Sequence, residues 1–126
     1  MLLHEELTKE IIGAFYIVYN KLGFGFLESV YEKAMMIELA KQGLMCERQK
    51  CIPVYYDNIE IGKYYADIVV EDKVILELKA CPIIKEHGLQ LYNYLRATNI
   101  EVGLLMSFGQ IPTIERKFFT NDLKKK

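Results

Sequence analysis

The sequence predicts a single domain of α+β or mixed α/β structure, with helices packed against one central sheet. Apolar residues in the first forty positions recur at the three- and four-residue steps of amphipathic helices. Between residues 51 and 79, β-branched and aromatic residues form short runs typical of strands. A helical segment and a short apolar strand follow. A length of 126 residues is usual for one compact domain, so residues 1–126 are expected to form one unit.

Two helices are expected first. The apolar stripe of the first covers residues 3–22, and Gly23 and Gly25 interrupt it. A second helical pattern extends over residues 26–40, and Gly43 is placed to cap its carboxyl end. The chain therefore begins with two amphipathic helices in succession.

Strands are expected next. Residues 51–56 and 59–61 flank the turn residues Asp57 and Asn58. Residues 64–70 and 74–79 are separated by a polar trio, which is typical of a hairpin with a three-residue loop.

The remaining elements close the domain. Residues 86–98 have a helical pattern, and residues 101–108 are nearly all apolar, as in a strand covered on both faces. Residues 114–119 are expected to form a strand or a helix, and the lysines at 124–126 to fray.

Composition limits the classes of function. There is no apolar run of membrane-spanning length, and an acidic pair stands where a secretion signal would be basic, so a soluble, cytoplasmic protein without a membrane partner is expected. The three cysteines fit no zinc motif and are expected to be reduced and buried. A net charge of -1 does not indicate a nucleic-acid binder, although a cation held by carboxylates would supply positive charge.

The hairpin carries the most specific prediction. If Val70 pairs with Val74, Asp67 lies opposite Glu77, and Tyr65 lies opposite Lys79. Alternation then points Glu77 and Lys79 to one face of the sheet.

Two facing carboxylates repel each other, and a divalent cation would give a reason to keep them together. Their hard oxygen ligands suit Mg²⁺ or Mn²⁺, and the backbone carbonyl of Leu78 could add a third ligand. Lys79 beside the ion could orient an attacking water or stabilise charge on a phosphate. The alternative is a solvated hairpin face on which Glu77 and Lys79 form an ordinary surface pair.

Two further features favour the metal site. Asp67 and Glu77 stand within otherwise apolar segments, where an unpaired carboxylate is costly. Gln90 and Tyr94 are four residues apart on one face of the third helix, which a short crossover could bring to the same site. Alternatively, they are a partly buried amide and a core tyrosine.

The order of these motifs resembles a known family. The motif order is similar to that of the PD-(D/E)xK nuclease superfamily: Asp67 comes first, Glu77-Leu78-Lys79 second, and Gln90 with Tyr94 third. The last pair resembles the QxxxY helix of the recombination-nuclease branch of that superfamily. The segment Gly25-Phe26-Leu27-Glu28-Ser29-Val30-Tyr31 resembles the signature of the GxxExxY proteins, a small family within that superfamily. The resemblance extends from the first helix to Gly109 and implies a restriction-endonuclease-like core with one mixed sheet.

The resemblance also implies roles for individual residues. Asp67 and Glu77 would bind the metal, Lys79 would activate water or phosphate, and Glu28 would enter the site from the second helix. Gln90 and Tyr94 would line the site. From its position alone, Glu28 is a carboxylate that suits the positive end of a helix dipole.

Other positions bear on the resemblance. His87 matches a histidine frequent in the family, although its position alone suggests a surface residue at a helix start. Three positions depart from the pattern: Phe24 replaces a frequent proline, Ser107 an asparagine, and Tyr65 a frequently basic residue.

These observations lead to an expected function with two alternatives. The leading expectation is a Mg²⁺- or Mn²⁺-dependent hydrolase that cleaves phosphodiester bonds in DNA more readily than in RNA, possible as a homodimer. A second is a nucleic-acid-binding or assembly module that keeps the nuclease fold without turnover. A third is an interaction protein whose hairpin charges are ordinary surface residues.

Overall fold

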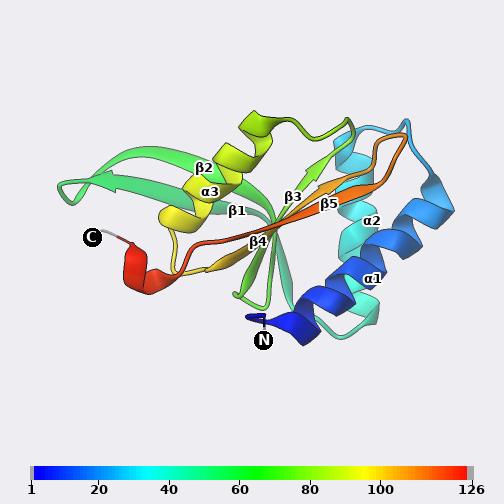
Figure 1. Cartoon of the computed structure of the whole chain (residues 1–126), viewed down its shortest axis with the longest axis horizontal. Helices are drawn as coiled ribbons and strands as arrows, with labels where there is room; N and C mark the ends of the chain where they lie inside the picture. Colours follow the sequence, from blue (N-terminus) through cyan, green and yellow to red (C-terminus); the bar gives the residue numbers. More distant parts are fainter. Residues whose placement is uncertain (1, 125–126) are drawn as a thin grey trace.

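A five-stranded mixed sheet separates two helices on one face from a third helix on the other (Figure 1). The computed structural model describes residues 2–124. Helices α1 (Glu5–Leu22) and α2 (Glu28–Lys41) pack on each other and cover one face, and α3 (Lys85–Arg96) covers the other. The predicted mixed α and β fold is confirmed.

The strands lie in sequence order, β1-β2-β3-β4-β5. Their bounds are β1 Cys46–Tyr56, β2 Ile59–Val70, β3 Val74–Lys79, β4 Val102–Ser107 and β5 Thr113–Phe118. Within residues 2–124, β3 and β4 form the one parallel pair, because α3 forms the crossover between them, and the other neighbouring pairs are antiparallel. A 3-10 turn, η1 (Asn121–Leu123), follows β5.

The predicted hairpin register is confirmed at its loop end. Val70 pairs with Val74, and the next two pairs follow in step to Ile68 with Leu76. The ladder between β2 and β3 ends there. The predicted pair of Tyr65 and Lys79 is therefore absent from the β2–β3 ladder, because β2 leaves β3 before reaching it.

The face beneath α1 and α2 holds the larger hydrophobic core. At its centre, the rings of Phe15 and Tyr31 both pack on Phe108, with centroids 4.6 and 4.3 Å from it. All three aromatic rings are fully buried. These contacts hold the two helices and the end of β4 together as one layer.

The face beneath α3 holds a second, smaller core. Leu91 of α3 lies directly on Gly103 of β4, where an added Cβ would come within 2.7 Å of the Leu91 Cδ1 atom. Because Gly103 has no side chain, α3 approaches the sheet closely at this point.

Strands β1 and β2 change face midway. Ile68 packs in the core under α1 and α2, whereas Ala66 belongs to the core under α3, although strict alternation would place both on one side. Gln49, across the ladder from Asp67, has a left-handed backbone with φ 53°. This local twist coincides with the point where β2 leaves β3.

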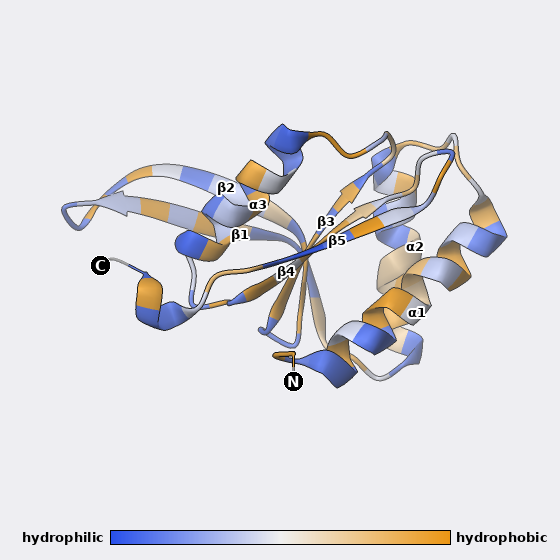
Figure 2. Cartoon of the chain, viewed as in Figure 1, coloured by the Kyte–Doolittle hydropathy of each residue, from blue (hydrophilic) through white to orange (hydrophobic). Residues whose placement is uncertain are grey.

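Beyond this point β1 and β2 continue as a two-stranded arm that extends past the rest of the sheet (Figure 1). Hydrophobic segments continue along it (Figure 2). Its large apolar side chains are exposed, including Tyr55, Tyr56, Ile59 and Ile61. The ladder slips by one residue between Val54 and Tyr55, which marks a β-bulge.

Some expectations for single residues were wrong. Cys51 and Cys81 are exposed rather than buried, because the first lies on the edge strand β1 and the second on the loop after β3, while Cys46 is partly buried. Lys124 does not fray, since its ammonium donates to the carbonyls of Thr98 and Ile100. Residues 125 and 126 lie outside the described part.

Between residues 2 and 124, no helix combines the length and hydropathy needed to cross a membrane.

Candidate active site

Two carboxylates take the place of ladder hydrogen bonds where β2 separates from β3. The backbone N–H of Asp67 donates to Oε1 of Glu77 at 3.2 Å, and the N–H of Leu78 donates to Oδ2 of Asp67 at 2.8 Å. The structure thus brings the two predicted ligands together.

Burial and mutual repulsion make it costly to ionise both carboxylates. Burial raises the pKa of Glu77 to about 8, and the nearby negative charge of Asp67 adds to the shift. The pKa of Asp67 is also raised, chiefly by burial. Glu77 therefore keeps its proton at neutral pH when no cation is bound, and a divalent cation that replaced this proton would compensate the charge of both carboxylates.

Lys79 stands beside this pair on β3. Its positive charge lowers the pKa of both Asp67 and Glu77, which places it within electrostatic reach of each. In residues 2–124, no hydrogen bond or ion pair engages its ammonium group. Its head group is therefore free to contact a ligand at the pair.

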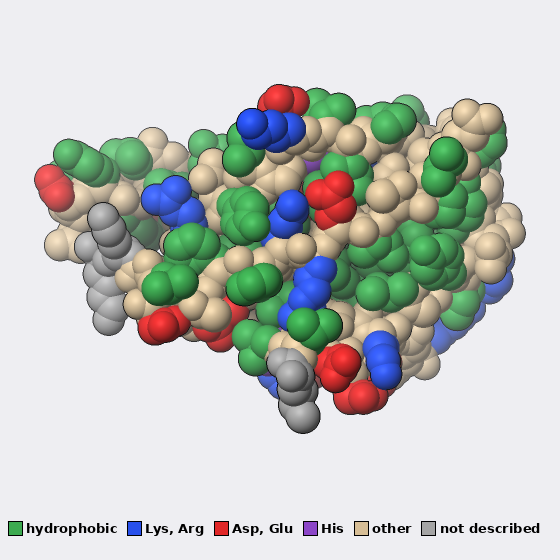
Figure 3. Space-filling view, viewed as in Figure 1, with side chains coloured by type: hydrophobic (Ala, Val, Ile, Leu, Met, Phe, Trp, Pro, Cys, Tyr) green, Lys and Arg blue, Asp and Glu red, His purple; other side chains and the backbone are tan. Residues whose placement is uncertain are grey.

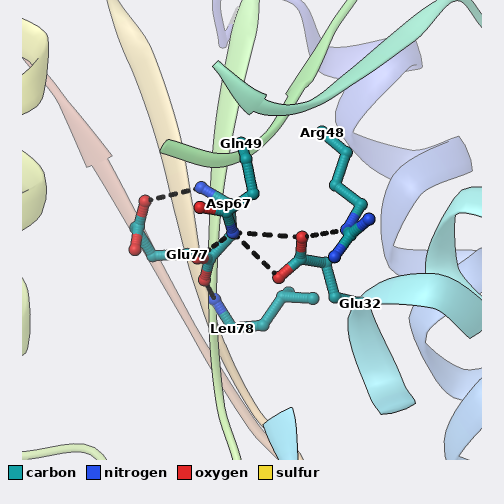
Figure 4. A network of polar contacts seen from close by, with 6 residues as sticks. All are labelled: Glu32, Arg48, Gln49, Asp67, Glu77 and Leu78. Atoms are coloured by element: carbon teal, nitrogen blue, oxygen red, sulfur yellow. Dashed lines mark hydrogen bonds and ion pairs between the residues drawn. The ribbon is translucent and has the colours of Figure 1, made fainter. Parts of the chain in front are cut away.

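A second carboxylate network adjoins Asp67 and includes three residues that sequence reasoning missed (Figure 4). Glu32 is buried and accepts from Nε of Arg48 at 2.6 Å. The Gln49 amide donates to both Glu32 oxygens at 3.1 Å and reaches Asp67 Oδ1 at 3.4 Å. Gln49 therefore links α2 to Asp67.

Only one of these three residues had a usable signal. Glu32 lies four residues after Glu28, one turn further along the same helix face, so both could have been assigned to the site. Arg48 and Gln49 belong to an irregular strand segment whose course the sequence does not indicate.

Glu28, at the start of α2, reaches the far side of the site. Its Oε2 lies 3.5 Å from the backbone N–H of Ala80, directly after β3, and its charge raises the pKa of Asp67. His87 of α3 approaches the same place, since the charges of Lys79 and Glu28 both act on its pKa. His87 Nδ1 accepts from the backbone N–H of Ile84, which leaves Nε2 as the free ring nitrogen.

Gln90 and Tyr94 act as a pair on α3. The Gln90 amide donates to the Tyr94 hydroxyl at 2.9 Å. Burial raises the pKa of Tyr94 to about 12, and the charges of Glu77 and Asp67 contribute to the shift. The Tyr94 hydroxyl therefore lies near the carboxylates and stays protonated at neutral pH.

The last residue of the GxxExxY-like segment has a structural part. The Tyr31 hydroxyl donates to the carbonyl of Gly23 at 2.6 Å and accepts from the N–H of Phe26 at 3.3 Å. These two hydrogen bonds hold the loop between α1 and α2 in place, and Glu28 is the first residue of the helix that follows. Ser107, a departure from the family pattern, is fully buried and donates to the carbonyl of Cys81.

The donors at the strand separation fit a hard divalent cation. Among residues 2–124, no three His, Cys, Asp or Glu side chains cluster as a metal site. Mg²⁺ needs only one or two carboxylates, because it retains several waters. The Lys79 carbonyl accepts from Phe108 on the β4 side, so the preceding carbonyl, of Leu78, faces Asp67.

Comparison with known proteins gives one match. A family model described as the PD-(D/E)XK nuclease superfamily matches residues 5–118, which include every residue of the site described above. Neither the curated proteins nor the solved structures contain a significant match.

Proposed function

Because the chain belongs to the PD-(D/E)XK nuclease superfamily, we propose that it is a nuclease that hydrolyses phosphodiester bonds in DNA. Nucleases of this superfamily generally use divalent metal ions and act on nucleic acids. The proposed ion is Mg²⁺ or Mn²⁺, with Asp67, Glu77 and the Leu78 carbonyl as its protein ligands. Bound there, the ion would lower the pKa of a water molecule and neutralise charge on the phosphate.

One observation supports this function above the others. Asp67, which is partly buried, and Glu77, which is buried, are held together where β2 separates from β3. Lys79 lies beside them, and in residues 2–124 its ammonium group has no hydrogen-bond or ion-pair partner. A purely structural pair of carboxylates would gain stability from replacement by apolar residues. A site that binds a cation and a phosphate explains why both charges and the lysine are present.

The protein's own residues have distinct proposed parts. Lys79 donates to the attacking water or to a phosphate oxygen on which charge develops. The Tyr94 hydroxyl, fixed by Gln90, donates a hydrogen bond at the edge of the site. Glu28 and the free nitrogen of His87 line the opposite side, where they can position a water. No covalent intermediate is required, because positioning and electrostatics supply the catalysis.

Several finer assignments belong to the same proposal. The loop that Tyr31 holds before α2 supports membership of the GxxExxY proteins. A single domain spanning residues 1–126 agrees with one continuous sheet whose two faces carry both cores. A homodimer would let so small a protein contact both strands of a duplex.

A second candidate is a nucleic-acid-binding module without turnover. The observation that favours it is that Asp67 and Glu77 accept hydrogen bonds from backbone amides and are therefore satisfied without an ion. The net charge of -1 does not separate the two candidates, since both would bind nucleic acid.

A cleavage assay separates the two candidates. Single- and double-stranded DNA and RNA are incubated with the protein in Mg²⁺, Mn²⁺ or chelator. A nuclease cleaves DNA in one of the metals and not in chelator. Asp67→Asn should need more metal for the same rate, whereas Glu10→Gln, an exposed change on α1, should behave as wild type. Absence of cleavage of every substrate would reject the nuclease and leave the module.

A further inference from the structure

A groove lies between the β1–β2 arm, the carboxyl end of α3 and the segment after β5. Its volume is about 670 Å³, within the range of about 300–1,000 Å³ typical of ligand pockets. Its wall combines aromatic, amide and basic side chains, among them Tyr55, Tyr64, Asn93, Arg96, Phe119 and Lys124. Figure 3 shows hydrophobic and basic side chains side by side over this part of the face.

The charge of the groove differs from that of the chain. The chain has seventeen acidic residues against sixteen basic ones, yet among residues 2–124 no Asp or Glu lines the groove. Arg96 and Lys124 both do, and the bonds from Lys124 to the Thr98 and Ile100 carbonyls fix its charge in place. The groove therefore favours an anionic occupant.

Local structure presents the aromatic rings. Val54, Tyr55 and Tyr64 line the groove beside the β-bulge, where Ile61 of β2 is skipped between the pairs Val54 with Gly62 and Tyr55 with Glu60. Tyr55 is 60% exposed and Tyr64 is 49% exposed, so their rings are open to a flat partner. Asn93 and Arg96 lie three residues apart on α3 and line the same groove as the two rings.

One aromatic contact joins the wall of the groove to the candidate active site. The ring of Tyr64 packs on the ring of Tyr94, with centroids 5.7 Å apart. Tyr94 in turn adjoins the carboxylates through the interactions described above. This contact places the groove next to the candidate site.

We propose that this groove binds a single-stranded segment of DNA beside the scissile phosphate, with unpaired bases stacked on Tyr55 and Tyr64 and a phosphate on Arg96. This inference rests on the proposed nuclease function and specifies its substrate. Exposed rings are matched by unpaired bases, whereas the bases of a duplex are stacked on each other and inaccessible. The two cationic side chains of the groove, Arg96 and Lys124, also match the phosphate charge of a single strand better than the higher charge density of a duplex.

Binding in chelator tests the proposal without cleavage. A short labelled oligothymidylate should bind more tightly than a duplex of equal length. Tyr55→Ala should weaken binding about tenfold, whereas Tyr56→Ala, the equally exposed neighbour outside the groove, should not. Arg96→Gln should reduce the salt dependence of log K by about 0.7, whereas Lys33→Gln on the opposite layer should leave it unchanged.

Cross-linking supplies a second measurement that requires no variant. A photoreactive uracil in the oligonucleotide should form adducts on Tyr55 or Tyr64, located by mass spectrometry. Adducts confined to other faces, equal effects of Tyr55→Ala and Tyr56→Ala, or tighter binding of the duplex would overturn the proposal. If the protein cleaved only duplex DNA in the presence of metal, the proposed strand binding in the groove would be wrong, whereas the proposed nuclease activity would stand. If the protein bound a single strand but cleaved nothing in any metal, the proposed strand binding in the groove would be supported and the proposed nuclease activity would be wrong.

Discussion

The two faces of the sheet contrast in size and in chemistry. In the described chain, sixteen buried residues form the core beneath α1 and α2, and eight form the core beneath α3. The larger core centres on the rings of Phe15, Tyr31 and Phe108. The α3 side instead adjoins Glu77 and Tyr94, whose pKa values burial raises.

This difference indicates how a small domain accommodates buried charge. A carboxylate pair lowers stability unless something else offsets it, and apolar burial supplies about 25 cal/mol per Å². The larger apolar core beneath α1 and α2 offsets the cost of the buried carboxylates, although Glu28 and Glu32 of α2 also reach the site. The following predictions test whether stability and chemistry are divided between the faces in this way.

The largest effect on stability is expected from the α1–α2 side. Phe108→Ala should lower the free energy of unfolding by about 3–5 kcal/mol, because it leaves a cavity between two aromatic rings. Leu95→Ala in the smaller core should cost nearer 2 kcal/mol. Urea denaturation in chelator measures both. An equal or larger loss in Leu95→Ala would break the contrast between the faces.

The largest effect on chemistry is expected from Lys79. Lys79→Ala should reduce metal-dependent cleavage by about two to three orders of magnitude, because a donor to the transition state is lost. Stability to urea and metal affinity by calorimetry should change little. The matched change Lys33→Ala, on the exposed side of α2, should leave cleavage intact. Full activity in Lys79→Ala would remove this residue from the mechanism.

The carboxylate pair should make the metal-free fold sensitive to pH. The folded-state pKa of Glu77 is about 8, above its ordinary value of 4.5, so the folded protein holds this proton more tightly than the unfolded chain. Its stabilising contribution is complete below about pH 4.5 and is lost as the pH rises through 8.

Glu77→Gln should remove that dependence. In chelator at pH 8 the variant should be more stable than wild type by about 1–3 kcal/mol, and the difference should vanish near pH 4. Urea titrations across this range measure it, with Glu10→Gln as the exposed control. The prediction fails if the unfolding free energy of the wild type does not fall relative to that of Glu77→Gln between pH 5 and 8. In that case the fold would not raise the pKa of Glu77.

A smaller effect is expected from the link between α2 and Asp67. Gln49→Asn keeps an amide and a residue that tolerates the left-handed backbone, but shortens its reach to Glu32 and Asp67. The metal concentration needed for half-maximal cleavage should rise about tenfold, with little change in stability. Gln42→Asn at the end of α2 is the control. Unchanged metal dependence would mean that Gln49 does not orient Asp67.

The sequence predicted the parts of this molecule that depend on local patterns. The three helices and the pairing of Val70 with Val74 follow from periodicity and turn residues. Two strand predictions were wrong, because β1 begins at Cys46 rather than at residue 51, and residues 59–61 and 64–70 belong to one strand, β2. The proximity of Asp67 and Glu77 follows from that register, although their hydrogen bonds arise where the ladder stops. The roles of the site residues remain predictions.

The remaining features depend on geometry that one sequence does not encode locally. The change of face at Gln49 reverses the side-chain alternation along both β1 and β2, and no turn residue signals it. Glu32 was not assigned to the site, and the weak amphipathic contrast of the α2 sequence does not mark its buried face. The exposure of Cys51 likewise depends on β1 being an edge strand.

The close seating of Leu91 on Gly103 sets the aperture of the site. His87, Gln90 and Tyr94 all belong to α3, so they move together if the helix moves as a rigid body. A side chain at position 103 would act as a spacer under its middle, since even a Cβ would overlap Leu91. Lifting α3 in this way would carry the Gln90–Tyr94 wall away from the carboxylates without altering any of these residues. The absence of a side chain at Gly103 thus helps to set the width of the candidate site.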